Sequence, residues 1–136
     1  MRRFLIPLLV AAALPAAAAP LDPASFEALS EGNTLRFATR DGALFGSEQY
    51  FPGRRSLWQH PDGSCAEGYW WPEGNDICFS YGPGSERECW SFESGPNGIA
   101  VRLIESSDGV RAGQLVIDLA GIDKTPLDCP APDVGT

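Results

Sequence analysis

Residues 65–93 read CAEGYWWPEGNDICFSYGPGSERECWSFE, and they carry the clearest secondary-structure pattern of the chain. It contains three short runs of alternating side chains, at about 65–71, 76–81 and 88–93. Turn residues separate the runs, first Pro72-Glu73-Gly74-Asn75 and then Gly82-Pro83-Gly84. Short alternating runs joined by such turns are typical of antiparallel hairpins, so the stretch predicts a β-meander.

The same pattern continues on both sides of this stretch. Further strands are expected at about 33–39, 43–51, 54–60, 99–105 and 112–119, with turns at Asp41-Gly42, Pro52-Gly53, Pro61-Asp62-Gly63, Pro96-Asn97-Gly98 and Asp108-Gly109. Eight strands in sequence order predict an all-β, antiparallel up-and-down barrel or a strongly curved sheet, because closure removes exposed strand edges.

Two flanking segments complete the expected domain, residues 19–136. A short N-terminal helix is expected at 22–29, with Asp22 as its N-cap and Gly32 ending it, and with Phe26 and Leu29 on the face that packs. Residues 120–136 read as an irregular tail.

Residues 1–18, MRRFLIPLLVAAALPAAA, are typical of a secretory signal peptide cleaved after Ala18. Two arginines precede an apolar run of 11 residues, Phe4 to Leu14, which is shorter than the roughly 20 residues of a membrane-spanning helix. We therefore expect a periplasmic or secreted protein with no membrane insertion after cleavage.

Charge and composition exclude several classes of function. The 136 residues contain 10 Lys and Arg against 18 Asp and Glu, for a net charge of −8. Such an acidic chain lacks the basic surface that nucleic-acid binding needs. With one His and no Cys-x-x-Cys motif, we expect no metal site and no cofactor.

The four cysteines, Cys65, Cys78, Cys89 and Cys129, predict two disulfides. Folding 76–81 back on 88–93 places Cys78 opposite Cys89 on one face of the hairpin. The expected bridges are therefore Cys78–Cys89 and Cys65–Cys129, and the second would hold the tail across the outer face.

Alternation divides the central strands into two faces. The expected interior set is Leu57, Gly68, Trp70, Ile77, Phe79, Trp90 and Phe92. The expected outer set is Arg54, Ser56, Trp58, His60, Cys65, Glu67, Tyr69, Trp71, Asp76, Cys78, Ser80, Cys89 and Ser91. We expect the interior aromatic side chains to fill the barrel by packing against one another.

The candidate binding site is an outer aromatic face. It consists of Trp58, Tyr69 and Trp71, with Arg54, Glu67 and His60 nearby. Either this face binds a protein partner or a small glycan or peptide, or the tail with Ile122, Leu127 and Pro130 covers it. The leading hypothesis is a non-enzymatic binding or protein-interaction domain.

Two other functions stay open. One is a small hydrolase acting on cell-wall material through His60 or through a pair of carboxylates drawn from Glu67, Asp76, Glu86 and Glu88. The other is an accessory domain with no ligand. Since acidic residues are frequent in this chain, such pairs arise by chance, and we expect no catalytic residue.

Three short motifs resemble those of a group of small secreted bacterial proteins of unknown function. They are Gly68-Tyr69-Trp70, Ile77-Cys78-Phe79-Ser80-Tyr81 and Cys89-Trp90. The resemblance covers about residues 26–93 and implies no activity. In size and strand number the chain is also loosely similar to lipocalin and avidin barrels. The lipocalin Gly-x-Trp motif is missing at the first strand, where Gly32-Asn33-Thr34-Leu35 stands.

Overall fold

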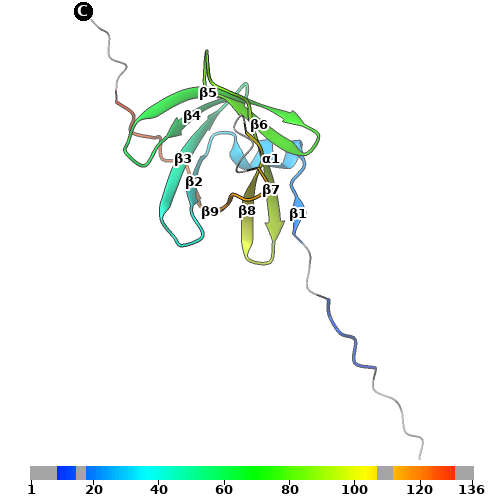
Figure 1. Cartoon of the computed structure of the whole chain (residues 1–136). Helices are drawn as coiled ribbons and strands as arrows, with labels where there is room; N and C mark the ends of the chain where they lie inside the picture. Colours follow the sequence, from blue (N-terminus) through cyan, green and yellow to red (C-terminus); the bar gives the residue numbers. More distant parts are fainter. Residues whose placement is uncertain (1–8, 15–17, 107–111, 131–136) are drawn as a thin grey trace, which may run out of the picture.

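Eight antiparallel strands follow one another around a closed barrel in a computed structural model of the protein (Figure 1). The structure describes residues 9–14, 18–106 and 112–130. The strands are β2 (Thr34–Ala38), β3 (Leu44–Phe51), β4 (Arg55–Gln59), β5 (Cys65–Glu73), β6 (Asp76–Ser80), β7 (Glu88–Gly95), β8 (Gly98–Glu105) and β9 (Val116–Asp123). Each pairs with the next, and β9 pairs with β2 to close the barrel. The predicted meander is confirmed.

Several observed strands differ from the predicted ranges at their ends. The last strand was expected at 112–119, but β9 spans Val116–Asp123. The expectation that the irregular tail begins at residue 120 is therefore wrong, because residues 121–123 pair with β2. Strand β4 begins at Arg55 because Arg54 has a left-handed backbone conformation, with φ 60°, in the turn after Gly53. A further short strand, β1 (Ala19–Pro20), pairs with the end of β7.

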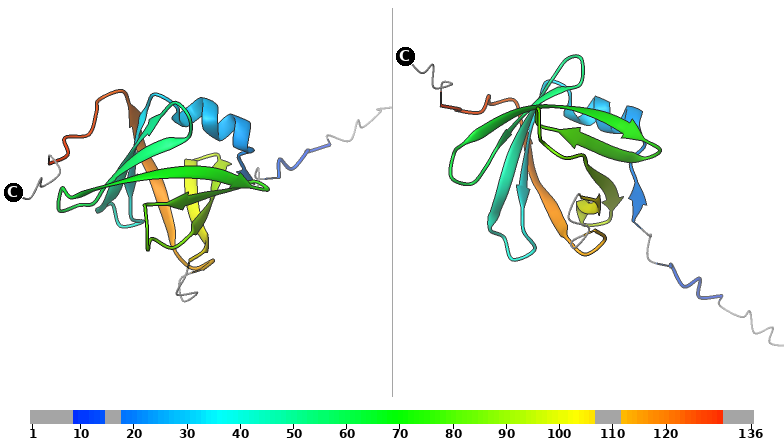
Figure 2. Two further views of the ribbon diagram at one scale, coloured as in Figure 1. Left: turned by 90° about the horizontal axis from the view of Figure 1, so that it is seen from above. Right: turned by 45° about the horizontal axis from the view of Figure 1, so that its top comes forward.

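Helix α1 (Pro23–Ser30) closes one end of the barrel and lies behind the barrel opening in Figure 1. Asp22 caps it, accepting a hydrogen bond from the Ser25 backbone N–H at 2.8 Å. The ring of Phe26 is fully buried and meets Trp70 and Phe92 at centroid distances of 5.0 and 4.6 Å. The expectation that this helix packs through Phe26 is confirmed, and Figure 2 shows α1 lying against the barrel from two further directions.

Both predicted disulfides are present, Cys78–Cys89 between β6 and β7 and Cys65–Cys129 between β5 and the tail. The tail crosses the outer face of β3 and β4. There the Leu127 backbone N–H donates to Gln49 Oε1 at 2.9 Å, and Gln59 Nε2 donates to the Asp128 carbonyl at 2.8 Å. Two disulfides indicate an oxidising, extracytoplasmic environment.

The face predicted for β4 is wrong. Trp58 lies opposite Glu48 on β3 and Ala66 on β5, and all three side chains point into the barrel. Ser56 is buried on the same interior side, while Leu57 lies opposite Glu67 on the outside. The tail therefore cannot cover Trp58, and it also leaves Tyr69 53% exposed.

Parts of three expectations lie outside the described residues. These are most of the signal peptide (1–8 and 15–17), the turn at Asp108-Gly109 and the end of the tail (131–136). Among the described residues, none forms a helix of sufficient length and hydrophobicity to cross a membrane.

Candidate functional site

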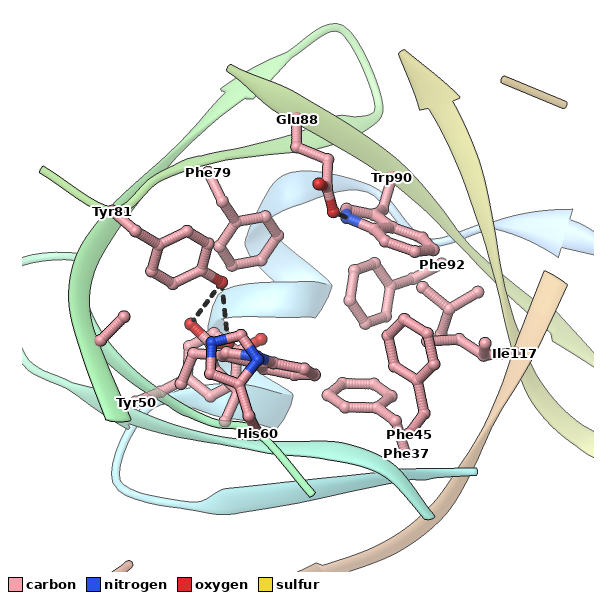
Figure 3. Close-up of a pocket in the computed structure, with 14 residues that line it drawn as sticks. Phe37, Phe45, Tyr50, His60, Phe79, Tyr81, Glu88, Trp90, Phe92 and Ile117 are labelled. Carbon is pink, nitrogen blue, oxygen red and sulfur yellow. Dashed lines mark hydrogen bonds between the residues drawn. The ribbon is translucent and has the colours of Figure 1, made fainter. Parts of the chain in front are cut away.

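The barrel interior is not filled. A cavity of about 460 Å³ lies inside the barrel. Figure 3 shows aromatic rings around it, with α1 behind them. The side chains that line it are Phe37, Phe45, Glu48, Tyr50, Trp58, His60, Ala66, Phe79, Tyr81, Glu88, Trp90, Phe92, Val101 and Ile117. The expected interior aromatic side chains do pack into one buried core, but Phe79, Trp90 and Phe92 also line this cavity, so they do not fill the barrel completely.

Two glycines shape the walls of the cavity. The indole ring of Trp58 lies over Gly46, where a β-carbon would collide with it. The ring of Tyr81 lies over Gly68 in the same way, and a β-carbon there would come 2.6 Å from Tyr81 Cδ1. Each glycine thus lets a large ring lie flat along the wall.

Glu48 is a carboxylate on the cavity wall and is only 2% exposed. The Tyr81 hydroxyl donates to its two oxygens at 3.0 and 2.9 Å. Burial raises the pKa of Glu48 to about 8, although the hydroxyl groups of Ser56 and Tyr81 lower it and the charge of Glu88 raises it further. Ser56 Oγ makes no hydrogen bond of good geometry among the described residues, so Tyr81 is the defined partner.

A second acidic side chain, Glu88, enters the cavity from the start of β7, opposite Phe79. Its Oε1 atom accepts a hydrogen bond from Trp90 Nε1 at 2.7 Å, which fixes the carboxylate beside the indole ring (Figure 3). Glu88 is half-buried, and it acts electrostatically on Glu48. The carboxyl groups of Glu48 and Glu88 therefore line the same cavity from different strands.

The open rim carries His60 and Trp58. Trp58 Nε1 donates to His60 Nδ1 at 3.2 Å, and the two rings meet edge to face. His60 is exposed, and Trp58 is half-buried against Phe37 and Phe45. These residues mark the entrance through which a ligand would reach the aromatic interior.

The six residues predicted to form one outer face are not brought together. Exposed Tyr69 and half-buried Trp71 do form an aromatic pair on β5, with ring centroids 5.4 Å apart, and Glu67 is exposed on the same side. Arg54 lies at the closed end, where it stacks over Trp70 at 4.8 Å and pairs with Glu27 at 3.4 Å.

The acidic residues considered for catalysis are dispersed in the same manner. Glu67 and Glu86 are exposed, while Asp76 is half-buried near Glu73 and Arg87. Only Glu88 of this group lines the cavity.

A cluster of ligand atoms outside the barrel does not form a metal site. Glu73, Cys78 and Cys89 bring their side-chain oxygen and sulfur atoms within 4.8 Å of one another. Both sulfur atoms belong to the Cys78–Cys89 disulfide, so neither is available as a thiolate ligand. Arg87 instead binds Glu73 at 2.6 Å and Glu105 at 2.5 Å, forming an ion-pair network.

Sequence reasoning missed Glu48 and Tyr81 as functional candidates. The run Gly46-Ser47-Glu48-Gln49-Tyr50 alternates, and it places Glu48 on the same face as Tyr50. An acid at an interior position of a barrel strand is the signal that could have been used, since buried carboxylates are rare without a structural or functional reason.

No protein-family model matches the chain, and no curated protein or solved structure matches it significantly.

Proposed function

We propose that this protein binds a small, largely apolar organic molecule inside the open end of its barrel and does not act on it chemically. The observation that carries the proposal is the cavity of about 460 Å³, lined by aromatic rings and by two carboxylates. Binding sites for small molecules are commonly concave, mostly apolar, and equipped with a few polar groups that orient the ligand. The size of this cavity lies within the range of roughly 300–1,000 Å³ that such sites span.

The rigid walls support this role. Phe79, Phe92, Val101 and Ile117 are each at most 3% exposed, and they belong to strands paired on both sides. A cavity formed by fixed side chains loses little conformational entropy when a ligand enters. The closed barrel therefore supports binding to a preformed site.

The outer aromatic pair, Tyr69 and Trp71, offers a different site for the same general function, the binding of a protein, glycan or peptide. The two rings are tilted against each other on the outside of the barrel, without the enclosure that the cavity provides. We place the principal site in the cavity and use the outer pair as the comparison in the test.

For the compartment, we propose the periplasm or the extracellular medium. The N-terminal sequence typical of a signal peptide and the two disulfides both support this location.

Titration with N-phenyl-1-naphthylamine, a neutral apolar dye that fluoresces in apolar sites, tests the proposal. Ala66→Leu enlarges a side chain that lines the cavity, whereas Ala120→Leu adds the same group at an exposed position of β9. We expect Ala66→Leu to weaken dye binding by about tenfold and Ala120→Leu to leave it unchanged.

The double variant Tyr69→Ala, Trp71→Ala completes the design. If the double variant still binds the dye and Ala66→Leu binds it more weakly, the dye site lies in the cavity. Loss of binding in the outer double variant, together with unchanged binding in Ala66→Leu, would contradict the proposal.

A further inference from the structure

We propose that the ligand of the cavity is an organic cation, a protonated amine or quaternary ammonium group attached to an apolar body. This inference deepens the proposed function and rests on it. It follows from three features of the cavity wall: its carboxyl groups, the absence of Lys and Arg among its described lining residues, and its aromatic rings.

The two carboxylates give the cavity acidic character. Glu48 is on β3 and Glu88 is on β7, so the acids come from separate parts of the barrel wall. The Tyr81 hydroxyl and the Trp90 indole N–H hold them in place. A ligand group between these walls meets acceptor oxygens that are already oriented by other hydrogen bonds.

No Lys or Arg is among the cavity-lining side chains of the described residues, and the single imidazole, His60, lies at the rim. No ion pair joins Glu48 to a basic side chain within the described part of the chain. Buried acids are normally compensated by a cation or by several hydrogen bonds, because an isolated buried charge is strongly unfavourable. A cationic ligand would supply the charge that lets Glu48 ionise, whereas an anionic ligand would be repelled by the ionised carboxylate.

The aromatic rings favour the same class of ligand. Four aromatic side chains line the cavity together with the two acids: Trp58, Trp90, Phe45 and Tyr81. The rings of Trp90 and Phe45 meet edge to face with their centroids 6.2 Å apart. The face of an aromatic ring attracts a cation by about 0.5–2 kcal/mol, and several rings around one site recognise ammonium groups. The deeper rings, Phe37 and Phe92, provide an apolar surface for the uncharged body of the ligand.

Three naphthalene compounds of nearly equal size test the charge preference at pH 7 by calorimetry. They are 2-naphthylmethylamine, which is a cation, 2-naphthylmethanol, which is neutral, and 2-naphthoate, which is an anion. We expect the amine to bind about tenfold more tightly than the alcohol, and naphthoate to bind most weakly.

Charge-removing variants assign the preference to the cavity. Glu48→Gln and Glu88→Gln should each reduce the ratio of amine to alcohol affinity several-fold. Glu67→Gln, which removes an equal charge from the exposed outer face, should leave the ratio unchanged. If Glu48→Gln fails to fold, Glu88→Gln still decides the question, because Glu88 is only half-buried.

The outcomes separate this inference from the proposed function. Equal or tighter binding of the alcohol or of naphthoate would overturn the cation preference alone, as would an unchanged ratio in Glu88→Gln. If none of the three compounds binds while N-phenyl-1-naphthylamine does, the cation preference also fails and the binding function stands. If no compound and no dye binds, both fail.

Discussion

The Tyr81 hydroxyl donates to both carboxylate oxygens of Glu48, at 3.0 and 2.9 Å, across the interior of the barrel. Tyr81 follows β6 and Glu48 belongs to β3, and these two strands are not neighbours in the sheet. The contact therefore connects two separate parts of the wall. It also holds a buried acid at a fixed position beside the proposed ligand.

Replacing Tyr81 by Phe should remove this connection and leave the ring in place. Because the Tyr81 hydroxyl lowers the pKa of Glu48, we expect that pKa to rise above about 8 in Tyr81→Phe. We also expect the free energy of unfolding to fall by about 1–3 kcal/mol, since a buried acceptor loses its partner. NMR titration of the Glu48 carboxyl carbon and urea unfolding measure the two effects. Tyr69→Phe, on the exposed outer face, is the control and should change neither.

Replacing Gly68 by Ala should disturb the wall beneath Tyr81. The added β-carbon would lie 2.6 Å from Tyr81 Cδ1 and 2.7 Å from the Ser80 carbonyl oxygen, and that backbone atom cannot move away freely. We expect a loss of about 1–3 kcal/mol in unfolding free energy. Gly121→Ala is the matched control, because nothing lies within 4 Å of its β-carbon position. Equal stability of the two variants would contradict the packing of Tyr81 on Gly68.

The barrel and its bridges could be predicted because they depend on local patterns. Turn residues mark the strand ends, and alternation across the Gly82-Pro83-Gly84 turn places Cys78 opposite Cys89. Helix α1 was equally readable, since Asp22 caps it and Phe26 provides its apolar contact. Each of these features involves residues close in sequence, or a pairing forced by elimination among four cysteines.

The face of β4 could not be read in the same way. Leu57 and Trp58 are adjacent apolar residues, so alternation alone fits either orientation of the strand. What selects Trp58 for the interior is the space above Gly46 on the neighbouring strand, a contact that depends on the β3–β4 register. The cavity could not be predicted for a similar reason. Its size depends on how side chains from many strands pack inside the barrel, and the sequence pattern does not give that packing.

The tail should be held mainly by the Cys65–Cys129 bridge. The double variant Cys65→Ser, Cys129→Ser removes a crosslink between residues 64 apart in sequence. The chain-entropy model gives a loss of about 4 kcal/mol in unfolding free energy. We also expect faster cleavage after Lys124 by a lysine-specific protease, since only a few hydrogen bonds then hold residues 125–130.

The comparison for this prediction is Cys78→Ser, Cys89→Ser, in which the tail crosslink remains. That variant should lose about 3 kcal/mol but keep the tail attached after cleavage at Lys124. Equal tail release in the two variants would show that the bridge does not hold the tail.

Stability should depend on pH through Glu48. Its pKa is raised from 4.5 to about 8 in the folded protein, so the folded state keeps a proton that the unfolded state has already lost. This contribution is fully present below about pH 4.5 and is lost as the pH rises towards 8, by roughly 2–5 kcal/mol in total. Urea unfolding between pH 5 and 8 measures the decline, and Glu48→Gln should show a flatter profile. Identical slopes in the two proteins would contradict it.

Binding of a cation should release a proton from the cavity. At pH 7 most molecules carry a proton on Glu48, because its pKa is about 8. An ammonium group nearby favours the charged carboxylate and so lowers the pKa of Glu48. The charge of Glu88 acts in the opposite direction and raises that pKa, and the hydroxyl groups of Tyr50, Ser56 and Tyr81 also face this region. Calorimetry of 2-naphthylmethylamine binding in phosphate and in Tris, whose ionisation enthalpies differ widely, should show release of up to about one proton per ligand. The release should disappear in Glu48→Gln and persist in Glu67→Gln. A binding heat that is the same in both buffers would place the ammonium group away from Glu48.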